Sequence, residues 1–529
     1  MTSVAGSHVR LAELVASLSL ATDLGLGQPM EQVLRSCVLG LDLAEEVGLG
    51  ESERAVVYYV ALLAWLGCHA DSYEQAAWFG DDIALRDASH TVDTAGPAMA
   101  SLILRHIGSG EPVLRRARLM GSLLASRGGV LGAMETTHCL VAGQFAMRLG
   151  LGPEVRDALQ HVFERWDGKG APAKLQGEQI ALAARIVVLA DLVEAVRRRG
   201  GVEAAVDVAR RRAGGQLDPG LAQHLCTNAD TLLGTLDDAT GWDEAIAAEP
   251  ALAIPLSGIE LDAALEAVAD FADLKSPYTT GHSRGVAERA ASAARLAGLG
   301  ESAAVELWRA GLMHDIGRLG VSNAIWDKQG PLSEAEMERV RMHPYLTQRT
   351  FSRSPRLARL AEVAAGHHER LDGSDYPRGL AGGALSPEAR ILAAADAYQA
   401  MTEPRPYRAA RAADDIATQL RAEVRDARLD AGAVDAVLGA AGHRVARRRE
   451  GPAGLTRREV EVLLLLARGQ SNNAIAERLV VSPRTVGHHV QHIYRKIGCS
   501  TRAVASLFAM QHGLLPELDR WTEDRPNDR

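Results

Sequence analysis

Apolar residues recur along most of the chain at the spacing of an amphipathic helix. Over 283–298, 301–314 and 385–402 they fall at i, i+3, i+4 and i+7, with Ala, Leu, Glu and Arg between them. Strand-like alternation of apolar and polar residues is scarce. Aromatic residues make up only 4% of the chain, so the cores must be built mainly from Leu, Val and Ala. The pattern predicts an all-α protein.

Two stretches of the helical sequence repeat each other. Residues 161–195 align without a gap onto 366–400, with 13 of 35 positions identical and the run E-R-x-D-G-x-x-x-P-x-x-L-x-G shared. A second match sets 47–52 against 297–302, at an offset of 250 instead of 205. Shared Asp-Gly, Pro and Arg-Ile positions are not ordinary helix composition, which favours a tandem duplication over a chance match.

The repeat defines a domain organisation for the 529 residues. We predict two related helical domains, over 10–235 and 258–440, joined through 236–257. The change of offset places about 45 additional residues in the first copy, somewhere between 68 and 137.

The second copy concentrates side chains that bind metals. Each histidine alone would be an ordinary core or surface residue, but together the donors lie beside apolar helical stripes and should point inward. Imidazole and carboxylate donors suit Fe, Mn or Zn, and adjacent donors can be shared between two ions. The expected ligands are His282, His314, Asp315, His343, His367, His368 and Asp396.

The stretch from about 277 to 410 resembles the HD-GYP branch of the HD phosphohydrolases. The matching pieces are YTTGHS, LMHDIGRLGV, the MHP around His343, HHERLDGSDYPRGL, ARILAAADAYQAMT and RPYR. The resemblance implies an all-helical domain with two or three metal ions, usually iron or manganese, that hydrolyses cyclic di-GMP to pGpG or GMP. It assigns the HD pair to His314 and Asp315, and we count Arg318 with them as catalytic.

The resemblance also places a phosphate-binding basic pair on Arg405 and Arg408, where planar guanidinium groups suit phosphate oxygens. This chain departs from the family in three ways. Arg318 replaces the usual Lys after the HD motif, and the GYP triplet reads Asp375-Tyr376-Pro377. The additional carboxylate of trimetallic members is not evident around Tyr278, so we expect two divalent ions, Fe or Mn.

The first copy lacks most of the metal donors. Only His138 and Asp191 survive, opposite His343 and Asp396, and two donors cannot hold a dinuclear centre. The other positions carry Gln32, Ala64, Trp65, Val162 and Phe163, and the nearby His69 and Asp71 fall beyond the aligned HD position. We predict a non-catalytic partner that packs on the second copy, mediates dimerisation or binds another ligand.

The segment over 452–515 predicts a four-helix nucleic-acid-binding domain after a basic linker at 441–454. Residues 441–511 carry 12 basic and 4 acidic side chains, although the whole chain has a net charge of −9. LTRREVEVL, IAERL, SPRTVGHHV and IYRKIG resemble the LuxR-type helix-turn-helix. That resemblance implies a recognition helix at 483–497 and dimerisation through the last helix. The residues expected to face double-stranded DNA are Arg484, Thr485, His488, His489 and Lys496.

Other features narrow the cellular setting. The five cysteines are scattered and the N-terminus has no basic segment followed by an apolar run, which favours a reducing cytoplasm without a signal peptide or membrane anchor. We therefore expect a cytoplasmic, homodimeric transcription regulator that hydrolyses a cyclic dinucleotide, with cyclic di-GMP favoured. Two alternatives stay open: a sensor that binds metal and nucleotide without turnover, and a hydrolase of another phosphate ester.

Overall fold

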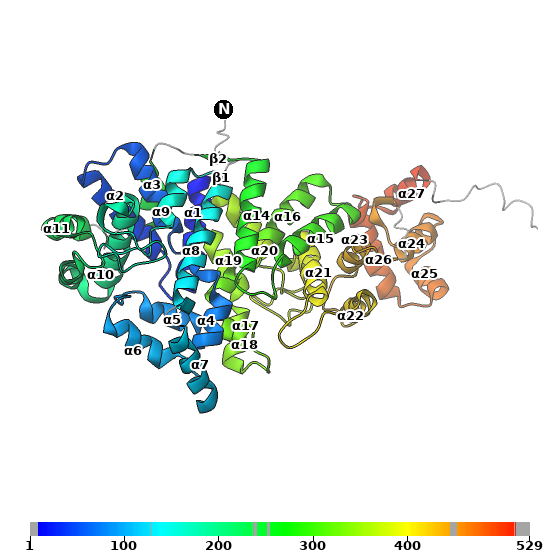
Figure 1. The fold of residues 1–529 in the computed structure, drawn as a ribbon. Coiled ribbons are helices and arrows are strands. Elements are labelled where there is room, and N and C mark those ends of the chain that lie inside the picture. The colour runs from blue at the N-terminus through cyan, green and yellow to red at the C-terminus, as the bar shows by residue number, and fades with distance from the viewer. Residues whose placement is uncertain are drawn as a thin grey trace, which may run out of the picture. The chain divides into compact units, whose positions relative to one another are not determined.

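The computed structural model describes residues 9–126, 129–234, 236, 241–250, 254–444, 452–512 and 514. The only strands among the described residues form one short antiparallel pair, in which β1 (Val9–Arg10) pairs with β2 (Pro255–Leu256); the other regular elements are helices. This confirms the predicted all-α class (Figure 1).

The chain divides into two compact units, Met1–His443 and Arg444–Arg529. Both repeated segments lie in the first unit, so the two copies share one folded body. The domain limits remain predictions: residues 235 and 515, and parts of the expected joint 236–257 and linker 441–454, lie outside the described residues.

The first copy is a bundle of mostly short helices. Its elements are α1 (Leu11–Gly25), α2 (Gln32–Glu46), α3 (Glu51–Leu63), η1 (Leu66–His69), α4 (Ser72–Phe79), α5 (Asp82–Ser89), α6 (Pro97–His106), α7 (Val113–Ala125), α8 (Gly129–Arg148), α9 (Pro153–Leu159), η2 (Gly177–Gln179), α10 (Leu182–Arg212), α11 (Pro219–Thr227), α12 (Ala229–Gly234) and α13 (Gly241–Ala247).

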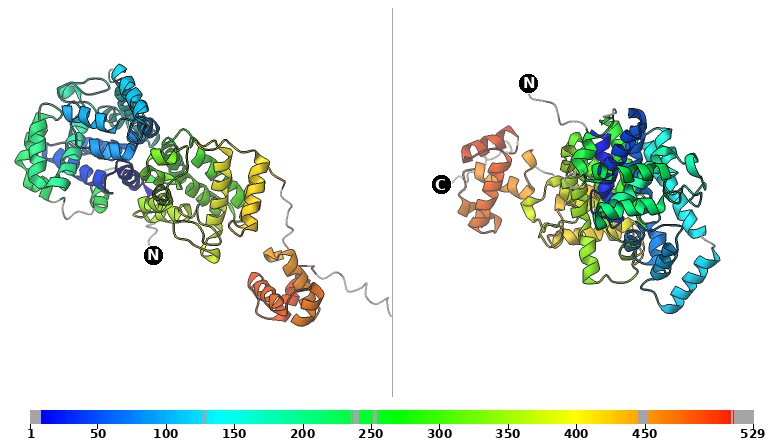
Figure 2. Two further views of the ribbon diagram at one scale, coloured as in Figure 1. Left: turned by 90° about the horizontal axis from the view of Figure 1, so that it is seen from below. Right: turned by 90° about the vertical axis from the view of Figure 1, so that its left-hand side faces the viewer.

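The second copy repeats this arrangement. Its elements are α14 (Ile259–Asp273), α15 (His282–Leu296), α16 (Glu301–Met313), η4 (Ile316–Gly320), α17 (Asn323–Trp326), α18 (Glu334–Arg341), α19 (His343–Phe351), α20 (Pro355–Ala364), η5 (Gly382–Ala384), α21 (Pro387–Thr402), α22 (Ala413–Arg425) and α23 (Ala431–Ala440). Helix α1 of the first copy packs against η4 and α19 of the second, and the two bundles lie side by side (Figure 2).

The start of the first site helix is built the same way in both copies. Helices α2 and α15 each have 15 residues and each follow a residue in the left-handed conformation, Glu31 in one copy and Gly281 in the other. A buried carboxylate then receives a backbone N–H of the first turn, since Asp23 accepts from Val33 and Asp273 from Ser283. Equivalent residues therefore make equivalent contacts 250 positions apart.

The loop before η2 and its counterpart before η5 match as well. Glu164 accepts the backbone N–H groups of Ala173 and Leu175, and Glu369, 205 positions later, accepts those of Arg378 and Leu380. A cis X-Pro bond precedes this contact in both copies, at Pro172 and Pro377. These shared contacts support the tandem duplication.

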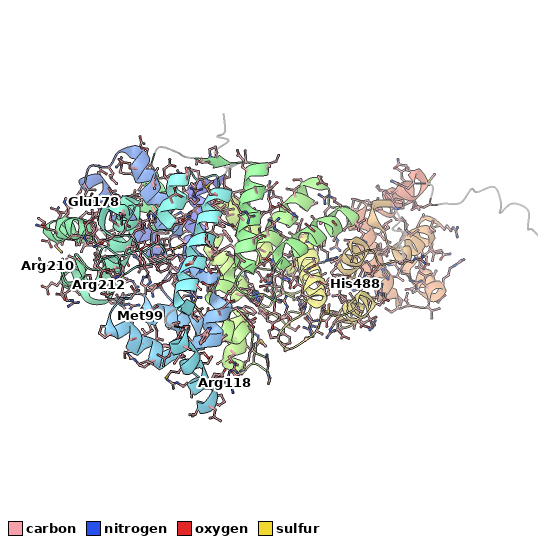
Figure 3. All side chains as sticks on the ribbon, in the orientation of Figure 1. Met99, Arg118, Glu178, Arg210, Arg212 and His488 are labelled. Carbon is pink, nitrogen blue, oxygen red and sulfur yellow. The ribbon has the colours of Figure 1, made fainter. Side chains whose placement is uncertain are left out.

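The inserted segment of the first copy carries α5, α6 and α7. Helix α7, on which Figure 3 labels Arg118, has no buried residue, and Val113 and Leu114 are 84% and 87% exposed. Helix α5 differs, because Asp82 and Arg86 are buried.

No single helix among the described residues is long and apolar enough to cross a bilayer. Glu51–His69 together with Ser72–Phe79 passes on length and composition only as a pair bent by 53°.

The described residues of the second unit form four α-helices, as predicted. They are α24 (Arg457–Ala467), α25 (Asn472–Leu479), α26 (Pro483–Lys496) and α27 (Arg502–Gln511), after the turn η6 (Pro452–Gly454). Thr456 and Glu459 form a capping box at the start of α24, and Ser482 caps α26 through the N–H of Thr485. Val486 is fully buried in the core of this unit.

Two glycines let the turn after the HD position lie directly against the backbone of the mid-domain histidine, which begins α19 in the second copy and lies within α8 in the first. A Cβ on Gly317 would lie 2.0 Å from the carbonyl oxygen of His343, and a Cβ on Gly67 would lie 2.2 Å from that of His138. No side chain fits at either position, because the obstructing atoms are backbone. This close contact holds the segment after His314 directly against α19.

We expect Gly317→Ala to destabilise the protein by at least about 1–3 kcal/mol, because overpacking must displace backbone. The melting temperature of the purified full chain measures this. Gly383→Ala is the matched control, since a Cβ there has no atom within 4 Å. Equal melting temperatures for the two variants would contradict this account of the close contact.

Candidate metal centre and nucleic-acid interface

Five segments of the second copy bring metal-binding side chains to one place. His282 begins α15, His314 ends α16 and His343 begins α19, while His367 and His368 follow α20 and Asp396 lies within α21. His282, His314, His343 and His367 are no more than 1% exposed. These rings have little freedom to move, because they are buried and their backbone lies at or next to the end of a helix.

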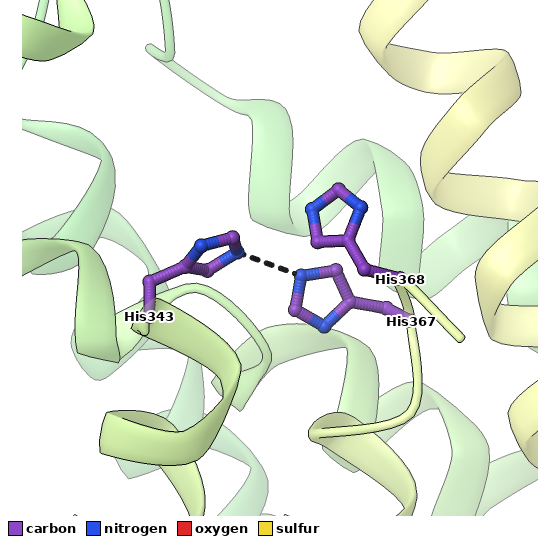
Figure 4. Close-up of side chains that lie close together, drawn as sticks. All are labelled: His343, His367 and His368. Carbon is purple, nitrogen blue, oxygen red and sulfur yellow. Dashed lines mark hydrogen bonds between the residues drawn. The ribbon is translucent and has the colours of Figure 1, made fainter. Parts of the chain in front are cut away.

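The donors form two adjacent groups. One contains His343, His367 and His368, shown in Figure 4, and the other contains His282, His314 and Asp315; within each, the donor atoms lie within 4.8 Å of one another.

Asp315 lies between the two groups. Its Oδ1 is 3.5 Å from His343 Nε2, and its Oδ2 is 3.5 Å from His314 Nε2. Asp396 adds a carboxylate to the second group, with Oδ1 3.2 Å from His282 Nε2.

Hydrogen bonds on the far side of each ring decide which nitrogen faces the centre. The Nδ1 atoms of His314, His343 and His367 lie 2.6–2.7 Å from the backbone carbonyls of Gly311, Val340 and Ala364. A carbonyl can only accept, so Nδ1 carries the proton and Nε2 presents a lone pair. His282 uses the carboxylate of Glu403 in the same way, at 2.9 Å.

This arrangement fits a divalent transition metal. His343 Nε2 and His367 Nε2 are 3.0 Å apart, and two lone pairs at that distance need a cation or a proton between them. His314 Nε2 is buried without a hydrogen-bond partner among the described residues. Imidazole nitrogens and carboxylate oxygens are the donors that suit such ions.

Burial keeps several of the histidines neutral, which a metal ligand requires. It lowers the pKa of His343 to about 4 and that of His367 to about 3. For His282, burial acts in the same direction, but hydrogen bonds to Asp396 and Glu403 outweigh it and raise the pKa to about 10. Burial would raise the pKa of Asp396, yet the surrounding histidines hold it well below its ordinary value.

A cavity of about 490 Å³ opens onto this cluster, which is within the size range of small-ligand sites. His282, Asp315, His343, His368 and Asp396 line it, and so do Arg318 and Arg405. Arg318 donates to Asp315 at 3.1 Å and stacks over the ring of Trp326 at 4.0 Å. Arg405 donates to the carbonyl of Tyr278 and to Glu403, both at 2.9 Å.

Arg408 is placed differently from Arg405. Its guanidinium donates to the carbonyls of Ala400 and Met401 at the end of α21, and it does not line the cavity. The two arginines are paired through their backbones, so their side chains point to different surroundings. The assignment of Arg408 as a phosphate ligand stays a prediction.

The Asp that replaces glycine in the GYP triplet causes no visible conflict. Asp375 is not among the described residues with a positive φ, and its carboxylate lies 3.8 Å from Arg370 and 3.7 Å from Arg428. Tyr376 stacks on His368 with ring centroids 4.7 Å apart. The triplet therefore supports the histidine group through its tyrosine.

Two residues that hold the site together were not predicted from the sequence. Glu403 orients His282 and Arg405, and Trp326 packs against both Arg318 and His343. The sequence signal for Glu403 is its place between Asp396 and Arg405. Nothing in the sequence singles out Trp326.

In the first copy, aromatic side chains occupy the equivalent place. Trp65 and Phe163 pack around His138, whose Nε2 binds the carbonyl of Ala64 at 2.6 Å. His90, from the inserted segment, lies 3.4 Å from Asp191. Among the described residues no metal-binding group of three donors forms in this copy.

His69 and Asp71 do not form a metal-binding site together either. His69 is fully buried and packs against Phe271, while the Asp71 carboxylate lines a separate cavity of about 240 Å³. That cavity is lined mainly by apolar side chains, among them Phe79, Leu102 and Phe163.

The predicted DNA-facing residues divide into two groups in the second unit. Arg484, Thr485 and His488 are exposed on α26, where Figure 3 labels His488, and His489 is half-buried. Lys496 instead donates to the carboxylate of Glu459 at 2.7 Å and to the carbonyl of Gly454. Gln491 and Arg495 are exposed at helical spacing from Arg484 and His488, although neither was predicted to face DNA.

A helical bundle that gathers buried histidines and aspartates into two adjacent donor groups is the framework of an HD-type metal-dependent phosphohydrolase. The HD domain profile matches residues 134–221 and 266–432, and the profile of the luxR family of bacterial regulatory proteins matches 453–509. The match inside both copies agrees with the repeat seen in the sequence.

Two relatives extend the comparison. The chain is 33% identical over 414 residues to 3'3'-cGAMP-specific phosphodiesterase 3 of Vibrio cholerae, covering 77% of this chain and 90% of the relative. It is 38% identical over 143 residues to the cyclic di-GMP phosphodiesterase response regulator RpfG of Xanthomonas campestris, covering 27% of this chain and 38% of that one.

The crystal structure of V-cGAP3, a cyclic GMP-AMP-specific phosphodiesterase of V. cholerae, superposes with a TM-score of 0.58 and 29% identity, covering 83% of this chain and 99% of that one. The chain belongs to the HD-GYP family of HD-domain phosphodiesterases, with a degenerate first copy and a LuxR-type domain after the second.

We expect Asp315→Asn to lower the metal content of the purified full chain, because an amide cannot replace a carboxylate that lies between two donor groups. Elemental analysis after purification with Mn or Fe measures the change. His138→Ala alters the equivalent of His343 in the first copy and is expected to leave the metal content unchanged. The assignment of the centre to the second copy would be refuted if both variants lost metal equally, or if neither variant lost metal.

We expect Arg484→Ala and Arg495→Ala to weaken DNA binding by the full chain and to reduce its salt dependence by about one phosphate contact each. Fluorescence anisotropy with genomic fragments at several salt concentrations measures both. Lys496→Ala is expected instead to lower the melting temperature, since Lys496 is paired with Glu459. A change in salt slope for Lys496→Ala would show that it contacts DNA after all.

Proposed function

We propose that the second copy is a metal-dependent phosphodiesterase acting on a cyclic dinucleotide, within a regulator whose C-terminal unit binds DNA. The observation that carries the proposal is the pair of donor groups joined by Asp315 beneath a 490 Å³ cavity. Two ions about 3.5–4 Å apart can bind the attacking and leaving oxygens of a phosphoryl transfer.

The donor groups suggest how two ions would be held. His343, His367 and His368 would bind one, and His282, His314 and Asp396 the other, with Asp315 shared between them. Iron or manganese is the expected metal, because the family resemblance implies one of them and mixed imidazole and carboxylate ligands suit both. When bound, the ions supply Lewis acidity and lower the pKa of a coordinated water.

The arginines of the cavity wall would hold the phosphates. Arg405 is fixed by Glu403 and by the carbonyl of Tyr278, which leaves its position set before a ligand arrives. Arg318 presents a second cation beside Asp315. Two fixed positive charges at the cavity favour an anionic substrate in a domain that is otherwise acidic.

The choice of nucleotide rests on two relatives. Cyclic di-GMP follows from the family resemblance and agrees with the name of the Xanthomonas relative. 3'3'-cGAMP is a second candidate, because the relative named for it matches 77% of this chain, including the first copy. Both are cyclic dinucleotides, and either would meet the same metal centre.

We expect the full chain, loaded with Mn or Fe, to convert cyclic di-GMP or 3'3'-cGAMP to a linear dinucleotide. Chromatographic separation of substrate and product measures this conversion. Asp315→Asn is expected to abolish turnover, and His138→Ala to preserve it. Binding of a nucleotide without product would support a sensor instead of an enzyme. Turnover restricted to a non-cyclic phosphate ester would indicate a different hydrolase.

The regulatory part of the proposal joins this chemistry to DNA. A cytoplasmic homodimer would place two recognition helices on neighbouring half-sites about one helical turn apart. Nucleotide state can change DNA affinity only if the ligand binds two conformations with different affinities. The test of this coupling is to compare DNA affinity with and without nucleotide. Asp315→Asn protein is used, because it is expected not to hydrolyse the nucleotide.

A further inference from the structure

Helix α5 belongs to the segment that only the first copy contains, yet its first residue is bonded to the second copy. Asp82 is fully buried. Its Oδ1 accepts the hydroxyl of Ser322 at 2.6 Å and the backbone N–H of Asn323 at 2.8 Å. Its Oδ2 lies 3.6 Å from Nζ of Lys275. One carboxylate thus holds two separate segments of the second copy.

The same helix is tied to the first copy one turn later. Arg86 pairs with Asp82 at 3.0 Å and donates to the carbonyl of Gly25 and the hydroxyl of Ser72. Ser72 and Ser322 are equivalent residues, 250 positions apart in the repeat. The Asp82–Arg86 ion pair therefore connects matching positions of the two copies: Asp82 binds Ser322 of the second copy, and Arg86 binds Ser72 of the first.

The segment held by Asp82 leads directly to the metal centre. The Asn323 side chain donates to the carbonyl of Lys275 at 2.6 Å and to Asp327 at 2.7 Å. Asp327 also accepts from Ser276, and both residues line the 490 Å³ cavity. Trp326, in the same short helix α17, supports the guanidinium of Arg318 and contacts the ring of His343.

The charges at this contact depend on each other. Burial would raise the pKa of Asp82, but Lys275, Arg86 and the hydrogen bonds from the second copy outweigh it and lower the pKa to about 2. Burial lowers the pKa of Lys275 to about 8 against the attraction of Asp82, with Arg86 and Arg318 also opposing the ammonium. Lys275 Nζ has no hydrogen-bond partner among the described residues, so Asp82 is the carboxylate that offsets its charge.

We propose that Asp82 of the non-catalytic copy is a positioning residue for the active site of the second copy. It fixes the segment that carries Trp326 and Asp327, and through it the placement of Arg318. The effect on turnover rests on the proposed phosphodiesterase activity, but the effect on local structure does not. The first copy, having lost its own metal donors, would thus support the second copy's site from behind the residues that line it.

The test separates hydrogen bonding from charge in the full chain. Asp82→Ala removes both, and we expect kcat to fall about 100-fold, as for a misplacement of about 1 Å, with metal content unchanged. Asp82→Asn keeps an acceptor for Ser322 and Asn323 but leaves Lys275 unpaired, and we expect a fall of about 10-fold. Lys275→Met should return Asp82→Asn to within about 3-fold of wild type and should not rescue Asp82→Ala.

Asp81→Asn is the matched control, because asparagine caps α5 as well as Asp81 does. The only charge contact it weakens is an exposed ion pair with Arg339 at 3.9 Å, of a kind that contributes little. Wild-type kcat in folded Asp82→Ala protein, or failure of Lys275→Met to improve Asp82→Asn, would overturn the proposal. Hydrogen exchange decides the case without any activity: residues 318–328 should exchange faster in Asp82→Ala, while 387–402 stay protected. If the wild type is inactive but Asp82→Ala still shows this change in exchange, only the proposed phosphodiesterase activity is rejected. If exchange is the same in both proteins, the role of Asp82 is rejected.

Discussion

The second copy is organised around buried imidazole lone pairs that face one another. The Nδ1 protons of His314, His343 and His367 are committed to backbone carbonyls, so their Nε2 atoms have no proton to share. Such a cluster is unfavourable unless a cation is bound or the rings are held firmly apart. Helix ends, the cap at Asp273 and the close backbone contact at Gly317 all serve to hold the rings in place.

The first copy has the same framework but lacks the facing imidazole lone pairs that need a bound cation. The caps, the carboxylate in the loop before η2 and the close contact at the glycine remain, while Trp65 and Phe163 occupy the space of the donors. Replacing polar donors by packed aromatic rings removes the need for a cation and leaves the core closed. The scaffold is therefore separable from the chemistry, and what persists in both copies is what the fold itself requires.

Loss of the metal donors did not make the first copy independent of the second. Its inserted helix α5 places a buried ion pair between equivalent positions of both bundles, and α1 packs against η4 and α19. A buried charge network is costly to break, because any member left alone is desolvated without a partner. This gives a physical reason for the two bundles to form one body.

The sequence by itself determined the helical class, the repeat and the set of metal-binding residue types, because helix periodicity and donor chemistry are local properties. It could not determine where Arg408 and Lys496 point, since the carbonyls of Ala400 and Met401 and the carboxylate of Glu459 come near only in the folded chain. Nor could it reveal Glu403 as the partner of His282, or Asp82 as a contact of Ser322, 240 residues away. These partners are chosen by tertiary packing, because a buried charge binds whichever complementary group the fold brings beside it.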